Sequence, residues 1–338
     1  MSTGVSRREL IIMGLAIGAF MTAPAFAQSQ SQSQTFPSRP IRMVIPFPPG
    51  ALPDIIARLV APKLGDSLGQ QVLVDNRGGA TGAIGLEFVS KSPPDGHTLG
   101  MLIITHGVNA ALEGSALDVP KQPFNLVRDF TPISQLTSNG YVLVIGARHN
   151  VRNLGELVAL ARSKPGSLTY GSSGTGGIIH LAGEWLGAAT KTQLTHVPYK
   201  SSAQAMSELA GGHIDMMFSS VALLKTVASS GRGRGIGATS SVRMSSAPEL
   251  PTFIEQGLAG FEIDGWYGIV GPPAMPATVV DRLSSELSRL VKLPDVREKL
   301  ASDGASPVGS TPAQFAALLQ SEDAKWRKVV QDIGLGGK

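Results

Sequence analysis

Apolar positions along the chain alternate between short continuous runs and runs at helical spacing. The apolar-rich run at 41–45 ends at a proline-rich segment, and apolar residues then recur at helical spacing as far as Leu68. Residues 72–74, 83–89 and 99–104 repeat the scheme as a predicted strand, helix and strand. Strands that alternate with helices form parallel sheets, so this pattern predicts an α/β fold.

The same alternation continues through the middle of the chain. Asn153, with Glu156 three residues later, has the sequence of a capping box and predicts a helix that runs to Ser163. Further strands are predicted at 168–171, 195–199 and 214–218, and further helices at 180–189, 202–210 and 221–228. The last third is mainly helical, with predicted helices at 277–291, 295–302 and 312–333. The last of these has Thr311 as its predicted N-cap and Pro312 at its first position. No repeat with the period of a solenoid is visible in the sequence.

Length and composition narrow the class of protein. At roughly 150 residues per domain, the 338 residues correspond to about two domains, and the 42% hydrophobic content is enough to build their cores. The net charge of +4 comes without a dense Lys/Arg stripe, which argues against nucleic-acid binding. The absence of cysteine excludes disulfides, thiolate metal sites and thiol nucleophiles.

The first 27 residues have the pattern of a signal peptide. Arg7 and Arg8 precede an apolar run at 10–20, and Ala25-Phe26-Ala27 is an A-x-A cleavage site. As a helix, this run would rise about 16 Å, which is short of the ~30 Å hydrocarbon core of a membrane. We therefore expect export by the Sec or the twin-arginine route, cleavage after Ala27 and a flexible leader at 28–36.

Two loops have the composition of anion-binding sites. Residues 47–53 and 171–177 each lie between a predicted strand and a predicted helix N-terminus. Small residues there let backbone N–H groups approach a ligand, and the helix dipole favours a negative charge. A plain turn is the alternative interpretation of either loop alone. One such loop in each half of the fold favours binding, because open α/β sheets bind ligands at the carboxyl ends of their strands.

Known catalytic motifs are missing from the sequence. Gly171-Ser172-Ser173-Gly174 lacks the G-x-S-x-G spacing, and there is neither a phosphate-binding P-loop nor an H-E-x-x-H motif. None of the six histidines forms an i, i+4 pair, so no metal site is predicted. A hydrolase that uses Ser173 and His180 is the remaining catalytic alternative. We predict a protein that is not an enzyme and that requires no cofactor, and we interpret His180 as a hydrogen-bonded structural histidine.

Six short motifs follow one another between Pro37 and Leu335. They are residues 40–50 with Asp54, Ala57 and Arg58; 74–77 with the glycines as far as Gly85; 94–99; 129–133; 170–174 with 180–184; and 196–200. In this order, behind a signal peptide, they resemble the motifs of the extracytoplasmic solute receptors of tripartite tricarboxylate transporters, the Bug or TctC-like proteins. The resemblance covers nearly the whole of the expected mature chain.

The resemblance implies a two-domain periplasmic-binding-protein fold of the type II, Venus-flytrap kind. A parallel-rich sheet is expected in each domain, together with a C-terminal helical segment and a ligand cleft between the domains. We expect the first domain at 37–135 plus 265–338 and the second at 136–264, because the strand–helix series is interrupted at 136–145 and resumes across 262–270.

The resemblance also implies a ligand site. In this family, two loops that match Phe47–Asp54 and Ser172–Gly177 act as tweezers on one carboxylate of the ligand, through backbone N–H groups, hydroxyls and bridging water. The predicted ligand-contacting residues are Phe47, Pro48, Pro49, Gly50, Ala51, Pro53, Asp54, Thr105, Ser172, Ser173, Gly174, Thr175, Gly176, Gly177 and Ser219. Within this set, Asp54 is expected to cap its helix and shape its loop, since an ionised carboxylate would repel that of the ligand.

The chain departs from the family pattern at several of these positions. Ala51 stands where a second glycine is usual, and Pro53 stands where threonine or another small residue is common. These changes remove an N–H group and a hydroxyl from the first loop. Gly177 replaces a frequent serine or threonine, and Ser219 replaces a frequent aspartate. Because an aspartate there would suit a ligand ammonium group, its absence disfavours an amino-acid ligand.

Together, these implications predict a receptor for a tripartite tricarboxylate-type transporter. We expect a periplasmic protein that binds a small carboxylate as a monomer and delivers it to the membrane permease subunits. The alternative is a receptor of the same fold that presents its ligand to a membrane sensor kinase. No nucleic-acid partner is expected in either case. Neighbouring genes for a permease or for a kinase would separate the two interpretations.

Overall fold

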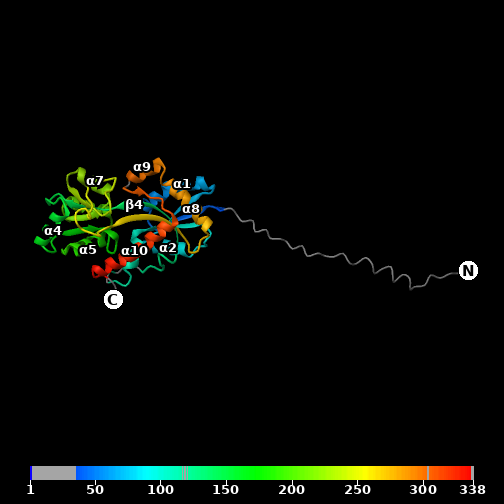
Figure 1. Ribbon diagram of the computed structural model, residues 1–338, viewed down its shortest axis with the longest axis horizontal. Helices are drawn as coiled ribbons and strands as arrows, with labels where there is room; N and C mark the ends of the chain where they lie inside the picture. The colour runs from blue at the N-terminus through cyan, green and yellow to red at the C-terminus, as the bar shows by residue number, and fades with distance from the viewer. Residues whose placement is uncertain (2–35, 116, 118, 120, 303, 336–338) are drawn as a thin grey trace. The chain divides into compact units, whose positions relative to one another are not determined.

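Two mixed β-sheets form the framework of the protein, and Figure 1 shows helices around each of them. The first sheet has the order β11–β4–β10–β3–β1–β2, with β1 (Ile41–Ile45), β2 (Val72–Asn76), β3 (Thr98–Ile103), β4 (Thr131–Gly140), β10 (Asp264–Gly271) and β11 (Ser306–Pro307). The second has the order β7–β6–β8–β5–β9, with β5 (Val142–Gly146), β6 (Thr169–Ser172), β7 (Thr195–Pro198), β8 (Met216–Ser219) and β9 (Gly233–Ala238).

Three neighbouring strands in each sheet, joined by helices, are parallel, as the sequence predicts. The strands β2 and β3 run parallel to β1, and β7 and β8 run parallel to β6. The remaining pairs of the described strands are antiparallel. One of these strands, β5, runs opposite to β6 although a helix joins the two. Each sheet is therefore parallel-rich on one side and antiparallel on the other.

The structure, a computed structural model, describes residue 1 and residues 36–335 apart from 116, 118, 120 and 303. The predicted signal-peptide cleavage site after Ala27 and the leader as far as residue 35 lie outside the described residues. Within the described part of the chain, no helix combines the length and the apolar character needed to cross a membrane.

Apart from α3, the helices that flank the sheets begin close to their predicted starts. They are α1 (Leu52–Leu68), α2 (Ala83–Ser90), α3 (Ile104–Ala111), α4 (Leu154–Ser163), α5 (Ile178–Thr190), α6 (Ser202–Gly211), α7 (Val221–Ser229), α8 (Ala277–Leu290), α9 (Pro294–Ser302) and α10 (Pro312–Asp332). Asn153 caps α4, since its side chain accepts a hydrogen bond from the N–H of Glu156 at 2.9 Å. Thr311 caps α10 by accepting from the N–H of Gln314. Both predicted caps are confirmed.

Helix α3 is an element that the sequence pattern does not reveal. The predicted strand at 99–104 ends at Ile103, and Ile104 already begins the helix. No polar cap residue marks this start; instead, the N–H of Ile103 donates to Nδ1 of His106 at 3.0 Å. A helix that starts inside an apolar run, without a cap signal, cannot be distinguished from a strand by periodicity.

The chain crosses between the two sheets twice. The first crossing is short, because Tyr141 alone separates β4 from β5. The return crossing connects β9 to β10. Within it, the N–H of Thr239 donates to the carbonyl of Tyr141 on the first crossing, and the carbonyl of Thr239 accepts from the N–H of Ile263. The predicted domain boundaries stay a proposal, and the first of them, between residues 135 and 136, falls inside β4.

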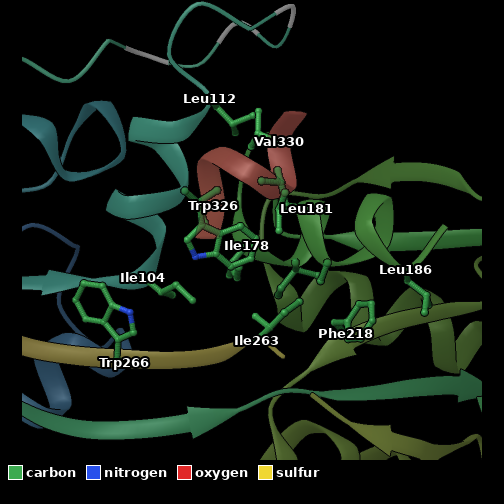
Figure 2. Close-up of a cluster of buried hydrophobic side chains, with 14 of the residues drawn as sticks. Ile104, Leu112, Ile178, Leu181, Leu186, Phe218, Ile263, Trp266, Trp326 and Val330 are labelled. Atoms are coloured by element: carbon green, nitrogen blue, oxygen red, sulfur yellow. The ribbon is translucent and has the colours of Figure 1, made fainter. Parts of the chain in front are cut away.

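One apolar cluster extends across both sheets. It joins side chains of α3, β10 and α10 on the side of the first sheet to side chains of α5 and β8 on the side of the second. Figure 2 shows Trp326 and Val330 of α10 gathered with Ile178 and Leu181 of α5. The other two clusters are each restricted to one sheet, the first with α1 and α8 and the second with α6 and α7.

Candidate functional site

The carboxyl ends of the parallel strands lie close to the crossing segments in both sheets. In the second sheet, Ser219 at the end of β8 pairs with Val142 at the start of β5. In the first sheet, β10 is antiparallel to β3 and β4, so the ends of both lie beside the start of β10. Because only Tyr141 separates the sheets at the first crossing, these two edges are adjacent. Helices α1, α3, α5 and α7 begin at them.

The first loop, residues 46–51, is held in place by Asp54. The Asp54 carboxylate accepts a hydrogen bond from the N–H of Gly50 at 2.9 Å, where the backbone has a left-handed φ of +83°. Nε of Arg58 and Nδ2 of Asn76 also donate to this carboxylate, each at 2.9 Å. The Asn76 amide donates in addition to the carbonyl of Phe47. The prediction that Asp54 shapes this loop is confirmed.

The charge of Asp54 is compensated within its own loop. Burial alone would raise the pKa of the carboxyl, but hydrogen bonds from Arg58, from the N–H of Gly50 and from Asn76 outweigh it. The pKa of Asp54 therefore lies below its usual value, and the side chain is ionised at neutral pH. Its hydrogen-bonding capacity is directed at the loop and not at a ligand.

The first turn of α1, directly after the first loop, has unpaired backbone donors. Ala51 is the N-cap of α1, and Pro53 lies in the first turn. The N–H groups of Leu52 and Asp54 have no acceptor among the described residues. They lie at the N-terminus of α1, where the helix dipole attracts an anion. The exposed residues of the loop are Pro48, Pro49 and Gly50.

The second loop, residues 173–177, connects β6 to α5. Ser172, at the end of β6, is fully buried, and its hydroxyl donates to the carbonyl of Gly174 at 2.9 Å and accepts from the Gly174 N–H at 3.1 Å. The N–H of Gly176 donates to Nδ1 of His180 at 3.1 Å. Gly174 and Gly176 have φ angles of +125° and +78°, which L-residues with side chains rarely adopt.

Three further N–H groups of the second loop are unpaired. Gly177 is the N-cap of α5, and the side chains of Ser173 and Thr175 are exposed. The N–H groups of these three residues have no acceptor in the part of the chain that the structure describes. A carboxylate at this loop would therefore meet backbone donors, exposed hydroxyls and the N-terminus of a helix.

A shared arrangement shapes three of the connections at these edges. In α1, α3 and α5 the third helical residue accepts a hydrogen bond from a backbone N–H just before the helix; these acceptors are Asp54, His106 and His180. Each acceptor fixes the loop backbone at the N-cap of its helix or one residue before it. The interpretation of His180 as a hydrogen-bonded structural histidine is confirmed, whereas His106 has no place in the predicted set.

The two remaining predicted residues lie at the same edges. Thr105 is half-buried in the first turn of α3. Ser219 is buried at the end of β8, and its hydroxyl has no hydrogen-bond partner among the described residues. The structure therefore places the predicted residues on three strand–helix connections and at the end of β8, while their contacts with a ligand stay a prediction.

The geometry gives no support to the hydrolase alternative. Nδ1 of His180 already accepts from Gly176, and no hydrogen bond joins His180 to Ser173. The serine that does approach a histidine is Ser172, whose hydroxyl lies 2.7 Å from Nε2 of His196. This hydroxyl is fully buried, so a substrate cannot reach it. Among the described residues, no group of three or more histidine or acidic side chains is arranged to hold a metal ion.

A left-handed turn beside the first loop also lies outside the predicted set. Residues 79–82 all have positive φ, and two of them, Ala80 at +46° and Thr81 at +55°, are not glycine. The hydroxyl of Thr81 accepts from Nδ2 of Asn109 on α3 at 2.9 Å. Glycines at 78, 79 and 82 indicated a turn, but nothing in the sequence indicated its hand at Ala80 and Thr81.

The comparison with protein families decides the assignment. A family model described as the tripartite tricarboxylate transporter family receptor matches residues 56–335. The chain belongs to this family. A relative from Pseudomonas sp. strain P51, described as the UPF0065 protein in the tcbD–tcbE intergenic region, is 39% identical over 97% of this chain and 95% of its own length. The resemblance inferred from the motifs is thereby confirmed.

Solved structures of TctC-type receptors share the fold. Rpa4515 of Rhodopseudomonas palustris, solved with adipate, is 29% identical to this chain, with a TM-score of 0.75 over 89% of this chain and 99% of its own. MatC from the same species, solved with bound malate, is also 29% identical, with a TM-score of 0.72 over 87% and 100%. Members of the TctC family are solute-binding receptors and not enzymes, which supports the same conclusion for this chain.

Proposed function

We propose that the protein is a periplasmic receptor that binds a small carboxylate between its two loops and delivers it to the membrane permease subunits of a tripartite tricarboxylate transporter. The observation that carries the proposal is the pair of loops at adjacent sheet edges, each at a helix N-terminus and each with unpaired backbone N–H groups. Adipate and malate, the ligands of two receptors of the same fold, are both small dicarboxylates. The export pattern of the first 27 residues supports a periplasmic location.

The donors of the two loops are sufficient for useful affinity. A hydrogen bond to a charged group contributes about 1.5–3 kcal/mol, and a micromolar complex requires about 8 kcal/mol. Three or four such bonds therefore supply much of this free energy, after the cost of ordering the ligand. No bond of the ligand has to be broken or formed, which agrees with the buried position of Ser172.

Native mass spectrometry and calorimetry test this proposal. The protein is purified without refolding, any retained ligand is identified by native mass spectrometry, and binding of that ligand, malate and adipate is measured. Gly174→Val should abolish binding, because its side chain would block several N–H groups at once. Gly231→Val is the matched control, since Gly231 also has a left-handed φ of +69° and open space around it. A retained ligand without a carboxylate, or unchanged binding by Gly174→Val, would contradict the proposal.

A further inference from the structure

Two stacked histidine rings lie beneath the second loop and contact both of its ends. The imidazole rings of His180 on α5 and His196 on β7 have centroids 3.9 Å apart and an interplanar angle of 27°. His180 accepts from the N–H of Gly176 through Nδ1. His196 contacts the Ser172 hydroxyl through Nε2, and that hydroxyl bonds to both the N–H and the carbonyl of Gly174. The pair therefore fixes the backbone at Gly174 and at Gly176.

The hydrogen bonds define the protonation state of His180. Because Nδ1 accepts from Gly176, the proton of the neutral ring is on Nε2, which lies 3.8 Å from a carboxylate oxygen of Glu184. Burial lowers the pKa of His180 to about 4. Burial, together with the neighbouring His180, also lowers the pKa of His196 to about 4. Both rings are therefore neutral at pH 7, as close stacking of two imidazoles requires.

Two other titratable groups face the stacked rings. The hydroxyl of Tyr170 on β6 donates to Glu184 at 2.6 Å, and its ring lies 5.0 Å from that of His196. Burial and the nearby Glu184 raise the pKa of Tyr170, so this side chain is uncharged. Glu184 is thus the acidic side chain that faces the histidines, and its proximity favours a positive charge on His196.

We propose that His180 and His196 are positioning residues for the second loop, and that the loop keeps the backbone geometry that receives a carboxylate only while His180 is neutral. The ligand part of this inference rests on the proposed function. Protonation at Nδ1 replaces the acceptor of the Gly176 N–H by a donor, and two donors that face each other cannot bond. Gly176 then loses its partner next to Gly177, the N-cap of α5.

Amide resonances in the ligand-free protein test the positioning role directly. His180→Leu removes the acceptor, whereas His180→Asn places an amide oxygen near the position of Nδ1. In His180→Leu, the Gly176 amide should shift and lose its protection from hydrogen exchange, and His180→Asn should restore both. Between pH 7 and pH 4 the same amide should titrate in the parent protein and not in His180→Asn. His213→Asn is the control, because His213 is an exposed histidine between α6 and β8, away from the second loop.

Affinity for malate and adipate, measured by calorimetry, tests the ligand part. The loss of one positioning hydrogen bond, worth about 1.4 kcal/mol, corresponds to a Kd about tenfold higher for His180→Leu, with His180→Asn close to the parent protein. His196→Gln keeps a polar group for Ser172 and should bind more tightly than His196→Leu. In each pair of variants, both lack the histidine but only one keeps the hydrogen bond, so the comparison isolates the effect of the hydrogen bond.

The outcomes distinguish this inference from the proposed function. A Gly176 amide that is unchanged in His180→Leu and does not titrate in the parent protein would overturn the positioning role. If His180→Leu does not fold, the titration of the parent protein and of His180→Asn decides the question alone. A disturbed amide with unchanged affinity for both acids would support the positioning role and overturn the assignment of this loop to the ligand.

Discussion

The carboxyl group of Asp264, the first residue of β10, has an incomplete set of hydrogen-bond partners. Oδ2 accepts from the hydroxyl of Ser138 at 2.6 Å, but Oδ1 is buried with no partner among the described residues. Burial raises the pKa of Asp264, Glu262 and Glu322 raise it further, and Lys325 and the bond from Ser138 only partly oppose them. An ionised Asp264 is thus a cost to the folded state at neutral pH.

We predict that Asp264→Asn stabilises the protein at pH 7. The pKa of Asp264 is higher in the folded state than in the unfolded state, so the folded state binds the proton more tightly. The free energy of unfolding therefore decreases as the pH rises from the unfolded-state pKa through the folded-state pKa. The introduced amide oxygen can still accept the hydrogen bond from Ser138. The free energy of unfolding should increase by about 1 kcal/mol at pH 7, which is the size of the penalty for one buried polar group without a partner. Urea unfolding at pH 7 and pH 3.5 measures this gain.

The gain should largely disappear at pH 3.5, where most of the Asp264 carboxyl is protonated in both the folded and the unfolded state. Asp281→Asn, an exposed position of α8, serves as the control and should change stability by less than about 0.5 kcal/mol. A variant Asp264→Asn that is less stable than the parent at pH 7 would show that the carboxylate has a stabilising partner.

Local roles of single residues could be predicted from the sequence, whereas long-range pairs could not. The role of Asp54 followed from the repulsion between its carboxylate and that of a ligand, and the role of His180 from its place after a glycine-rich loop. The stack of His180 on His196 depends on the packing of α5 against the sheet that contains β7, and no periodicity reports such a contact. The pairing of Ser172 with His196 was missed for the same reason.

At the scale of elements, helix α5 is positioned through Gly183 and Tyr170. The Tyr170 hydroxyl donates to Glu184 at 2.6 Å and lies 3.2 Å from the carbonyl oxygen of His180, so the ring is fixed against α5. A Cβ atom at Gly183 would overlap this buried ring. The glycine lets α5 approach β6 closely, and this approach sets the position of the helix at which the second loop ends.

We predict that Gly183→Ala destabilises the protein by about 1–3 kcal/mol, because the Tyr170 ring has no room to move. Gly155→Ala is the matched control on α4, where the position is exposed and an added Cβ would be 3.4 Å from Oδ1 of Asn153. That change should be neutral or stabilise by about 0.5–1 kcal/mol, through helix propensity. Thermal unfolding followed by circular dichroism compares the two, and equal melting temperatures would refute the packing argument.

Elements with a polar cap and regular spacing were predicted well, and those without such signals were not. Helix α10 was recognisable from Thr311 and Pro312, and α4 from Asn153. Helix α3 begins inside an apolar run, and its N-terminus is capped by His106, a residue type that carries no capping signal. The left-handed turn at 79–82 depends on a contact between Thr81 and Asn109, which are 28 residues apart.

At the scale of the whole molecule, α10 adds a third connection between the two sheets. Trp326 of α10 lies with its ring centroid 6.0 Å from that of Trp185 on α5. The nearby Phe261, on the return crossing, packs against Trp185 with ring centroids 4.8 Å apart. The sequence predicted the two crossings, but not that α10 packs against α5 beside the second sheet. Any hinge motion between the two sheets therefore has to break or rearrange the contact between Trp326 and Trp185.

We predict that both sheets unfold in one cooperative transition. Residues from Phe36 onward form a single compact unit, and one apolar cluster joins the two sheets. Thermal unfolding followed by far-ultraviolet circular dichroism and by tryptophan fluorescence should give coincident curves, with one peak in calorimetry. Two separated peaks would show that the shared core does not couple the two sheets.

The variant Trp326→Ala removes the contact with Trp185. It should lower the melting temperature strongly and reduce the free energy of unfolding by about 3–5 kcal/mol.

The position of β10 also sets the order in which the chain can complete its structure. This strand lies between β3 and β4 in the first sheet, yet it begins only at Asp264. A growing chain that has not reached this residue already contains every strand of the second sheet, but β3 and β4 lack the neighbour that joins them. Their open edges persist until the last quarter of the sequence is made, and such edges are where partly folded chains associate. The first sheet, which contains the N-terminal strand β1, is thus the last of the two sheets to be completed.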